Sequence, residues 1–326
     1  MLHSVAFQGS MIRAEHHQAD ALRLALLSWK HLTNPIIEAQ SVHKTFKDHD
    51  VLNGLDLQVE PGSVVGLLGA NGAGKSTLIK CLLGLQRIDS GSVQLFGEDS
   101  WDLSARSKAK LGYVPQEVKL YPWMRVKDTT AYIGEFYETW DEKLVDELID
   151  RWSLRPDACV STLSGGELQK LGLTVALGHR PDLLILDEPA AAMDPAARRE
   201  FVNTILDPVS DDPTVLFSTH IMSDLELVAT HIAYIEDGRI VLWDRLENLQ
   251  RRMKRVRLHA ASEFPPSFSW PGALRTQVDG CDAVLALPDV DEPVIASMRS
   301  QWKADVFVED LNLEDIFLEL HDGTAV

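Results

Sequence analysis

The sequence has 326 residues and a formal net charge of −18, from 31 Lys and Arg residues against 49 Asp and Glu residues. This length is enough for one large domain or two modest ones, and the negative charge argues against a broad, nonspecific grip on nucleic acid. No window reaches the roughly 18 uninterrupted apolar residues of a membrane-spanning helix. The three cysteines are too scattered to predict a disulfide framework or a metal site. We therefore expect a cytosolic protein in a reducing compartment.

Residues 1–33 do not continue the pattern that follows them. Four apolar residues between positions 22 and 32 recur at helical spacing, which predicts a weakly amphipathic helix. The apolar run at 21–29 is interrupted by Arg23 and lacks the positive n-region of a secretory signal peptide. A loose N-terminal extension is the simplest interpretation, and a helix that binds a partner or a membrane surface is the alternative.

From position 36 the sequence predicts strands, at residues 36–42 and 55–60. Phe46 is expected in the loop between them, where an aromatic ring could stack on a nucleotide base. A phenylalanine of the core is an equal alternative for this residue. A short apolar run at 64–68, rich in β-branched residues, then predicts a buried strand.

The segment after this strand matches the phosphate-binding pattern G-x-x-x-x-G-K-[ST] in full, and a helix is expected over residues 78–83. Its glycines allow backbone N–H groups to close around phosphate oxygens, and the following helix adds its positive dipole end. Lys75 is expected to reach the β- and γ-phosphates, and the Ser76 hydroxyl can ligate Mg²⁺. The predicted phosphate cradle consists of Gly69, Ala70, Asn71, Gly72, Ala73, Gly74, Lys75, Ser76 and Thr77.

The middle of the chain alternates strands and helices. Strands are expected at 92–96 and 111–114, the second running into Gln116, and two helical patterns fill 126–152. Ser164, Gly165 and Gly166 then precede a long helix that extends to about position 178.

Two adjacent carboxylates, Asp187 and Glu188, end an apolar run that begins at Leu183. Continuous apolarity indicates a strand of a parallel sheet, and ligands bind at the carboxyl ends of such strands. Asp187 is placed to hold Mg²⁺ beside Ser76, and Glu188 to orient or deprotonate a water molecule in line with the γ-phosphate. The alternative is a pair of solvated acids. His220 ends the next predicted strand, 214–219, and can reach the same edge.

The last part of the chain changes in character. A hairpin is predicted around Asp237-Gly238, and a small α+β accessory domain follows from about position 245. It opens with a basic stretch, which we interpret as a solvated face or a docking patch. Strands are expected at 282–287 and 305–308, and helices at 293–302 and 313–320.

The run Leu163-Ser164-Gly165-Gly166-Glu167 resembles the signature motif of the ATP-binding-cassette (ABC) ATPases. Over about residues 36–243 the other motifs fall in the order of that family. They are the aromatic loop at Phe46, Walker A at 69–76, the Q-loop at Gln116, Walker B at 183–188, the D-loop at Asp194 and the switch histidine at His220. Two departures are Glu167, a frequent variant of glutamine, and Ala191, where the family usually has a hydroxyl-bearing residue.

The resemblance implies an α/β fold with a P-loop NTPase ABC ATPase core, antiparallel β pieces and a helical subdomain. It implies a head-to-tail dimer in which Ser164, Gly165 and Gly166 of one subunit complete the ATP site of the other. The implied catalytic residues are Glu188 and His220. The implied nucleotide contacts outside the phosphate cradle are Phe46, Gln116, Ser164, Gly165, Gly166 and Asp194, and the implied Mg²⁺ residues are Ser76, Gln116 and Asp187.

We expect an N-terminal extension (1–33), a nucleotide-binding domain (34–244) and an accessory domain (245–326). The last domain resembles the tails of ATPases that serve exporter-type permeases encoded as separate chains. The resemblance thus implies an ATPase subunit that powers export from the inner face of the cell membrane, with no nucleic acid as partner. A non-transport ABC ATPase that acts on DNA or ribosomes is the alternative, and a P-loop kinase is disfavoured by Ser164-Gly165-Gly166 and His220.

Overall fold

The computed structural model describes residues 34–47, 49–191, 193–206 and 214–321. The helix expected within 1–33 lies outside these residues. The chain divides between Trp243 and Asp244 into two compact units, and each is described by itself. Among the described residues, no helix is both long and apolar enough to cross a bilayer.

The larger unit is built on a six-stranded sheet with the strand order β10-β9-β3-β8-β7-β6. Its strands are β3 (Val64–Leu68), β6 (Leu111–Val114), β7 (Leu183–Asp187), β8 (Thr214–Thr219), β9 (His231–Glu236) and β10 (Arg239–Arg245). Every residue of β3, β7 and β8 is buried, which is why their sequences are almost continuously apolar. These three strands pair in parallel, so their carboxyl ends lie at one edge of the sheet. The predicted α/β class is confirmed.

A second, antiparallel sheet has the order β2-β1-β4-β5. It consists of β1 (Ile37–Phe46), β2 (His49–Val59), β4 (Ser90–Leu95) and β5 (Glu98–Asp99). The prediction for β2 was too short, because Asp50, Asn53 and Gly54 are residues that strands usually avoid. Pairing with β1 along the whole hairpin overrides that preference. Phe46 is the last residue of β1 and not a loop residue.

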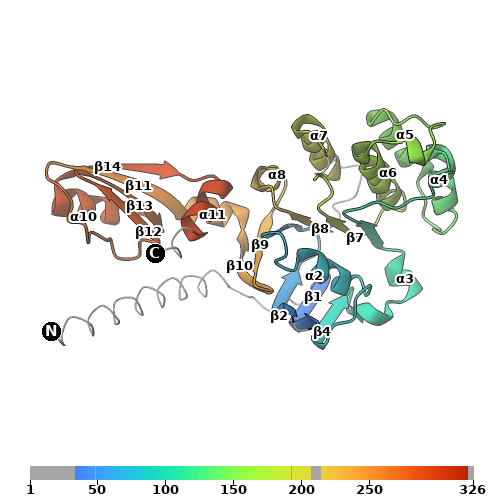
Figure 1. The fold of residues 1–326 in the computed structure, drawn as a ribbon, viewed down its shortest axis with the longest axis horizontal. Coiled ribbons are helices and arrows are strands. Elements are labelled where there is room, and N and C mark those ends of the chain that lie inside the picture. The colour runs from blue at the N-terminus through green and yellow to red at the C-terminus, as the bar shows by residue number, and fades with distance from the viewer. Residues whose placement is uncertain (1–33, 48, 192, 207–213, 322–326) are drawn as a thin grey trace. The chain divides into compact units, whose positions relative to one another are not determined.

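Seven α-helices are described in the larger unit, together with the 3-10 turns η1 (Ser100–Asp102) and η2 (Val160–Thr162). They are α2 (Lys75–Leu82), α3 (Ala105–Lys108), α4 (Val126–Gly134), α5 (Glu142–Arg151), α6 (Gly165–Leu177), α7 (Pro195–Leu206) and α8 (Met222–Glu226). The two helical patterns predicted over 126–152 are confirmed as α4 and α5, which gather with α6 in Figure 1. Asp141 caps α5, whose apolar stripe from Leu144 to Ile149 is buried.

The C-terminal unit is an antiparallel sheet with the order β12-β13-β11-β14. Its elements are α9 (Leu246–Arg252), β11 (Met253–Ala260), β12 (Arg275–Asp279), β13 (Asp282–Pro288), α10 (Glu292–Trp302), β14 (Ala304–Asp310) and α11 (Leu313–His321). Met298 of α10 packs in one core with Val256, Leu285 and Val306 from three strands. The predictions of α10, α11, β13 and β14 are confirmed, whereas β11 and β12 were not predicted.

The basic stretch that opens this unit is exposed at Arg251 and Arg257 and half-buried at its other basic residues. Its residues belong to α9 and β11, and most of their charges are paired with acids of the same unit. Arg252 pairs with Asp289 (3.0 Å), and Lys254 pairs with Asp310 (2.6 Å). From Val256 to Ala260 of β11, buried apolar residues alternate with exposed polar ones, as in a strand with one buried face. The density of basic residues in the sequence hid this alternation, so the strand was not predicted.

Candidate functional site

The phosphate-binding loop connects β3 to α2 and is packed against its neighbours. Gly74, the residue before α2, has φ 109°, a conformation that side chains rarely adopt. A Cβ atom there would lie 2.9 Å from the Val51 carbonyl oxygen, and one at Gly69 would lie 2.6 Å from that of Ile235. Both positions therefore require glycine. The loop leads into the N-terminus of α2, where backbone N–H groups and the helix dipole favour an anion.

Lys75 is the first residue of α2, and its side chain is only 4% exposed. Its Nζ donates hydrogen bonds to the carbonyl oxygens of Gly69 (2.8 Å) and Ala70 (3.2 Å). It also lies 3.3 Å from Oε1 of Glu188. The buried ammonium group is thus held by oxygen atoms of the loop and of the end of β7.

Asp187 lies at the end of β7 and is 2% exposed. Its Oδ1 accepts hydrogen bonds from the hydroxyls of Ser76 (3.0 Å) and Ser218 (2.8 Å). Ser218 was not predicted, although it faces Asp187 in the register of β7 and β8. Burial, together with the charge of Asp187, raises the pKa of Tyr113 on β6 to about 12.

Glu188 has a left-handed backbone, with φ 46°, which is uncommon for a residue with a side chain. Its backbone N–H is held by the Ser218 carbonyl oxygen (3.2 Å) and hydroxyl (2.9 Å). This turn aims the carboxylate between two basic groups, because Oε2 lies 3.2 Å from Nδ1 of His220. Glu188 is 9% exposed and the His220 side chain is 45% exposed, so the cluster opens to solvent on the histidine side.

The oxygen set at this edge suits Mg²⁺. Ser76 and Asp187 place a hydroxyl and a carboxylate 3.0 Å apart, and Mg²⁺ prefers such hard oxygen ligands. Within the described part of the chain, no three His, Cys, Asp or Glu side chains gather into a metal cluster. Mg²⁺ is usually bound through one or two carboxylates and the phosphates of a substrate.

The predicted Q-loop residue, Gln116, follows β6 and is exposed. Its carbonyl oxygen accepts a hydrogen bond of 2.7 Å from Nε2 of Gln169, which is 5% exposed within α6. Gln169 thereby connects the helix of the signature motif to the backbone of the Q-loop. Sequence reasoning did not single it out, because one glutamine inside a helix has no distinguishing pattern.

The signature residues begin α6. Ser164 caps the helix in a capping box: its hydroxyl accepts from the Glu167 N–H (3.3 Å), and its own N–H donates to the Glu167 carboxylate (2.8 Å). The Ser164 hydroxyl also donates to that carboxylate at 2.7 Å. The backbone N–H and then the hydroxyl of Ser164 lower the pKa of Glu167. Ser164 and Gly165 are exposed and Gly166 is half-buried, and the Ser164 hydroxyl donates to Glu167 of its own helix.

The two remaining predicted residues also lie at exposed positions. Asp194 lies directly before α7, and its Oδ1 accepts a hydrogen bond of 3.0 Å from the Ala197 N–H. Phe46 is 43% exposed at the end of β1, which excludes the alternative of a core phenylalanine. The structure therefore joins Ser76 to Asp187, and Lys75 and His220 to Glu188, with Ser218 bridging the two sets. Phe46, Ser164 and Asp194 lie outside these contacts.

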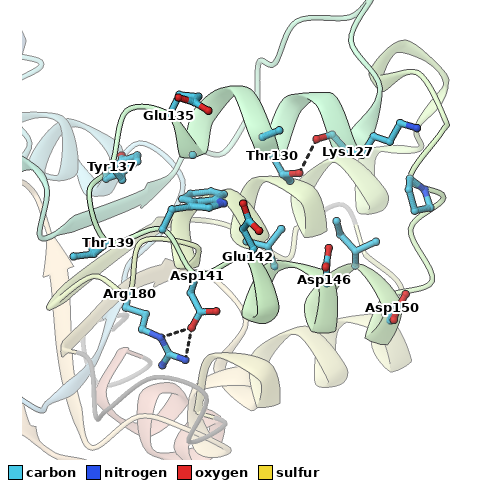
Figure 2. Close-up of a pocket in the computed structure, with 16 residues that line it drawn as sticks. Lys127, Thr130, Glu135, Tyr137, Thr139, Asp141, Glu142, Asp146, Asp150 and Arg180 are labelled. Atoms are coloured by element: carbon cyan, nitrogen blue, oxygen red, sulfur yellow. Dashed lines mark hydrogen bonds and ion pairs between the residues drawn. The ribbon is translucent and has the colours of Figure 1, made fainter.

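A groove of about 1150 Å³ lies along α4 and α5 (Figure 2), and no residue of this cluster lines it. Its two basic residues are already paired, Arg180 with Asp141 (2.7 Å) and Lys127 with Asp157 (2.7 Å). Five carboxylates contribute to its lining: Glu135, Asp141, Glu142, Asp146 and Asp150. A triphosphate would meet repulsion here, so size alone does not make this groove the nucleotide site.

Four exposed aromatic residues form one patch beside the groove residues of α4. This aromatic patch consists of Tyr121, Trp123, Tyr132 and Phe136, and Trp123 and Phe136 are 72% and 69% exposed. Ring centroids lie 5.1 Å apart for Tyr121 and Trp123, and 5.3 Å apart for Tyr132 and Phe136. Clustered exposed aromatic side chains are typical of protein–protein interaction sites.

The sequence model of the family described as "ABC transporter" matches residues 52–191. YhaQ of Bacillus subtilis, an uncharacterized ABC transporter ATP-binding protein, is 31% identical over 288 residues, which cover 85% of this chain and 96% of YhaQ. The Nod factor export ATP-binding protein I of Cupriavidus metallidurans is 32% identical over 295 residues, covering 87% and 97%.

Solved structures show the same likeness. An ATP-binding subunit of an ABC transporter is 25% identical, with a TM-score of 0.61 over 66% of this chain and 92% of that chain. The ATP-binding cassette MJ0796, solved as a dimer in a post-hydrolysis state with ADP and Pi, is 22% identical. It superposes with a TM-score of 0.58, covering 64% of this chain and 98% of that chain.

Proposed function

The chain belongs to the ATP-binding proteins of ABC transporters, and from this premise we propose that it powers export through a separate transmembrane permease. It is the ATP-binding, ATP-hydrolysing subunit of such a transporter. The observation that carries the proposal is the contact cluster of Lys75, Ser76, Asp187, Glu188 and His220 at one sheet edge. Export is supported by the relatives named for Nod factor export.

ATP binding begins at the phosphate-binding loop. The backbone N–H groups from Gly69 to Thr77 cradle the phosphates, and Lys75 exchanges its contacts with loop carbonyls and Glu188 for phosphate oxygens. This exchange removes Lys75 from Glu188, so that the carboxylate becomes available for water. The buried position of Lys75 supports the role, because a phosphate contact there is weakly screened by solvent.

We assign Ser76, Asp187 and Gln116 as the residues that would hold Mg²⁺, and the ion would neutralise negative charge on the phosphates. Ser218 holds Asp187 for this contact by donating to the same oxygen atom that accepts from Ser76. The Ser218 hydroxyl also accepts from the Glu188 N–H, so one serine orients both carboxylate residues.

In hydrolysis, Glu188 accepts a hydrogen bond from the attacking water and takes its proton as the water oxygen bonds to the γ-phosphorus. The bond from the γ-phosphorus to the β–γ bridging oxygen breaks at the same time, and ADP leaves with that electron pair. His220 faces the same carboxylate from the solvent side, and we assign it to orienting Glu188 and contacting the γ-phosphate. A positioned general base contributes about 10²–10⁴-fold in rate.

The second half of the site comes from a second ATPase subunit. Ser164, Gly165 and Gly166 offer a helix N-terminus to an anion, and Ser164 and Gly165 are exposed. One γ-phosphate does not require two helix N-termini from one chain, which supports a head-to-tail dimer. Asp194, also exposed, is placed with them at the dimer interface.

We assign residues 34–244 to the nucleotide-binding domain and 245–326 to an accessory domain. The segment 121–137, which follows the Q-loop, is our docking surface for the permease, and its aromatic patch supports this assignment. Docking would hold the subunit at the inner face of the cell membrane. Action on DNA or ribosomes, the alternative function, has no comparable support in a chain of net charge −18.

The permease proposal is tested by co-purification from detergent-solubilised membranes of cells that express the tagged chain. The wild type is expected to retain a multi-span membrane protein, and the double variant Trp123→Ala, Phe136→Ala to lose most of it while still binding ATP. Truncating two exposed aromatic residues at the centre of an interface commonly costs more than about 2 kcal/mol in affinity.

Trp101→Ala is the matched control, because Trp101 is a 54% exposed tryptophan on a different element, η1. It is expected to leave the complex intact. A complex that survives deletion of residues 121–137 would exclude this segment as the docking surface, and an ATP-dependent partner that proves to be DNA or a ribosome would overturn the transport assignment.

A further inference from the structure

The ring of Phe46 is held from one side by a buried cation. Nζ of Lys44 lies 5.2 Å from the ring centroid, and the Lys44 side chain is only 10% exposed. Phe46 itself is 43% exposed. One face of the ring is therefore engaged by an ammonium group, an attractive arrangement, while a large part of the ring remains open to a ligand.

Asp89 holds this arrangement from a second element. It lies directly before β4, and its Oδ1 accepts from Nζ of Lys44 at 2.7 Å while its Oδ2 accepts from the Thr45 N–H at 2.6 Å. The Asp89 N–H in turn donates to the His43 carbonyl oxygen at 2.9 Å. One residue thus fixes three consecutive residues of β1 just before Phe46. The Lys44 and Thr45 hydrogen bonds lower the pKa of the Asp89 carboxyl, which keeps it charged.

The ring also lies at the end of the hairpin that approaches the phosphate-binding loop. Phe46 pairs with His49 in the β1–β2 register, and Val51, two residues further, packs against Gly74 at the start of α2. Two residues of a strand span about 7 Å. A nucleotide with its phosphates in the loop can therefore bring its base to the hairpin end.

We infer that Lys44 and Asp89 are positioning residues for the base of ATP: Asp89 fixes Lys44, and Lys44 fixes the Phe46 ring on one face so that adenine stacks on the other. The inference rests on the proposed role of Phe46 in nucleotide binding. A ring that is already ordered does not have to be immobilised when the base arrives, so the ordering cost of binding is reduced. Because Asp89 holds Nζ of Lys44 at 2.7 Å, the ammonium group is kept beside the ring.

The experiment compares the binding of Mg-ATP with that of inorganic tripolyphosphate, which has no base, by isothermal titration calorimetry. Lys44→Met and Asp89→Asn keep the size of each side chain and remove its charge. Each is expected to weaken ATP binding about two- to fivefold and to leave tripolyphosphate binding unchanged. In a Phe46→Ala background, Lys44→Met is expected to have no further effect on ATP binding.

The chain offers a matched control in Lys110. This lysine pairs with Asp182 at 2.8 Å and lies 5.9 Å from the centroid of Phe96, so it repeats the lysine–aspartate–phenylalanine arrangement on other elements. Lys110→Met is expected to bind ATP as the wild type does. Lys44→Arg keeps a cation over the ring and is expected to retain ATP affinity.

The outcomes separate this inference from the function on which it rests. Phe46→Ala is expected to weaken ATP binding about fivefold or more without affecting tripolyphosphate. If Phe46→Ala binds ATP as tightly as the wild type does, the base-stacking role of Phe46 is excluded, and this inference is excluded with it. If Phe46→Ala weakens ATP binding and both charge-removing variants do not, only the positioning role of Lys44 and Asp89 is excluded. An equal loss of ATP and tripolyphosphate affinity in Lys44→Met would also exclude it.

Discussion

Glu188 and Glu319 are both buried carboxylates, 9% and 6% exposed, and each lies between two basic side chains. Glu188 contacts Lys75 at 3.3 Å and His220 at 3.2 Å. Glu319, in α11 of the C-terminal unit, contacts Arg255 at 3.0 Å and Arg275 at 3.5 Å. The charges and distances are similar, but the surroundings are not.

Glu188 has a left-handed backbone beside the phosphate-binding loop, and its partner His220 is open to solvent. Its contacts can therefore be exchanged when a substrate arrives. Glu319 lies in a regular helix and binds permanently charged arginines, one of which also pairs with Asp315 at 3.1 Å. These contacts tie α11 to the sheet. We propose that the Glu188 cluster is a functional site, because a strained backbone and a ligand-binding loop meet it, and that the Glu319 cluster is structural, because regular elements enclose it.

The largest expected effect is that of Glu188→Gln on turnover. The amide keeps the size of the side chain but cannot take a proton from water, so the hydrolysis rate is expected to fall about 10²–10⁴-fold while ATP binding is retained. Removing the carboxylate also frees Lys75 for phosphate, and an ATP-bound dimer is expected to accumulate in size-exclusion chromatography. Steady-state turnover with ATP is the measurement.

Glu200→Gln is the control for this variant, because Glu200 is 46% exposed and pairs only loosely with Lys170 at 3.6 Å. It is expected to hydrolyse ATP at the wild-type rate. Lys75→Ala should instead weaken nucleotide binding itself. Undiminished turnover in Glu188→Gln would show that Glu188, like Glu319, has only a structural role.

The second prediction is that a Glu319 variant loses stability but keeps its affinity for ATP. Glu319→Leu removes the buried carboxylate between the half-buried Arg255 and Arg275, which are 22% and 27% exposed. Removing one partner of a fully buried ion pair costs about 3–5 kcal/mol, so a cost below this range is expected here. Hydrogen exchange should show a corresponding loss of protection in α11 and β11, while ATP affinity stays unchanged. Glu309→Leu removes an exposed partner of Arg257 and is expected to cost less than about 1 kcal/mol. Equal effects of the two variants would contradict the structural role of Glu319.

The contrast between these two sites could be predicted only in part from the sequence. Asp187 and Glu188 are recognisable because an unbroken apolar strand ends in two acids downstream of a phosphate-binding loop. Arg255 and Glu319 gave no such signal, because the basic residues of β11 concealed the strand and its partners lie about sixty residues away. Pairing across a sheet depends on tertiary register, which one sequence does not reveal.

The same dependence on tertiary register limits prediction within the catalytic edge, which is the edge of the six-stranded sheet that carries Asp187 and Glu188. Lys75, Ser76 and His220 belong to motifs or strand ends and were predicted. Ser218 and Gln169 were not, since a serine in a buried strand and a glutamine in a helix are ordinary residues there. Only the pairing of Ser218 with Asp187, and the approach of α6 to the Q-loop, give them a role.

The third and smallest effect is expected for Ser218→Ala, which tests whether the catalytic edge depends on that unpredicted residue. The variant removes the hydroxyl that donates to Asp187 and accepts from the Glu188 N–H, although the Ser218 carbonyl oxygen remains. A hydrogen bond to a charged group contributes about 1.5–3 kcal/mol, so kcat is expected to fall about ten- to a hundredfold. KM for ATP should change much less, because the phosphate cradle is untouched.

Thr214→Val is the matched control, since it removes a buried hydroxyl from the other end of β8, where Thr214 accepts a 3.0 Å hydrogen bond from the Gly62 N–H. It is expected to lower the free energy of unfolding and leave kcat unchanged. Ser218→Thr keeps a hydroxyl and should recover part of the lost rate. If Ser218→Ala lowers stability but not kcat, Ser218 is a packing residue like Thr214, and the orientation of Glu188 rests on its backbone turn alone.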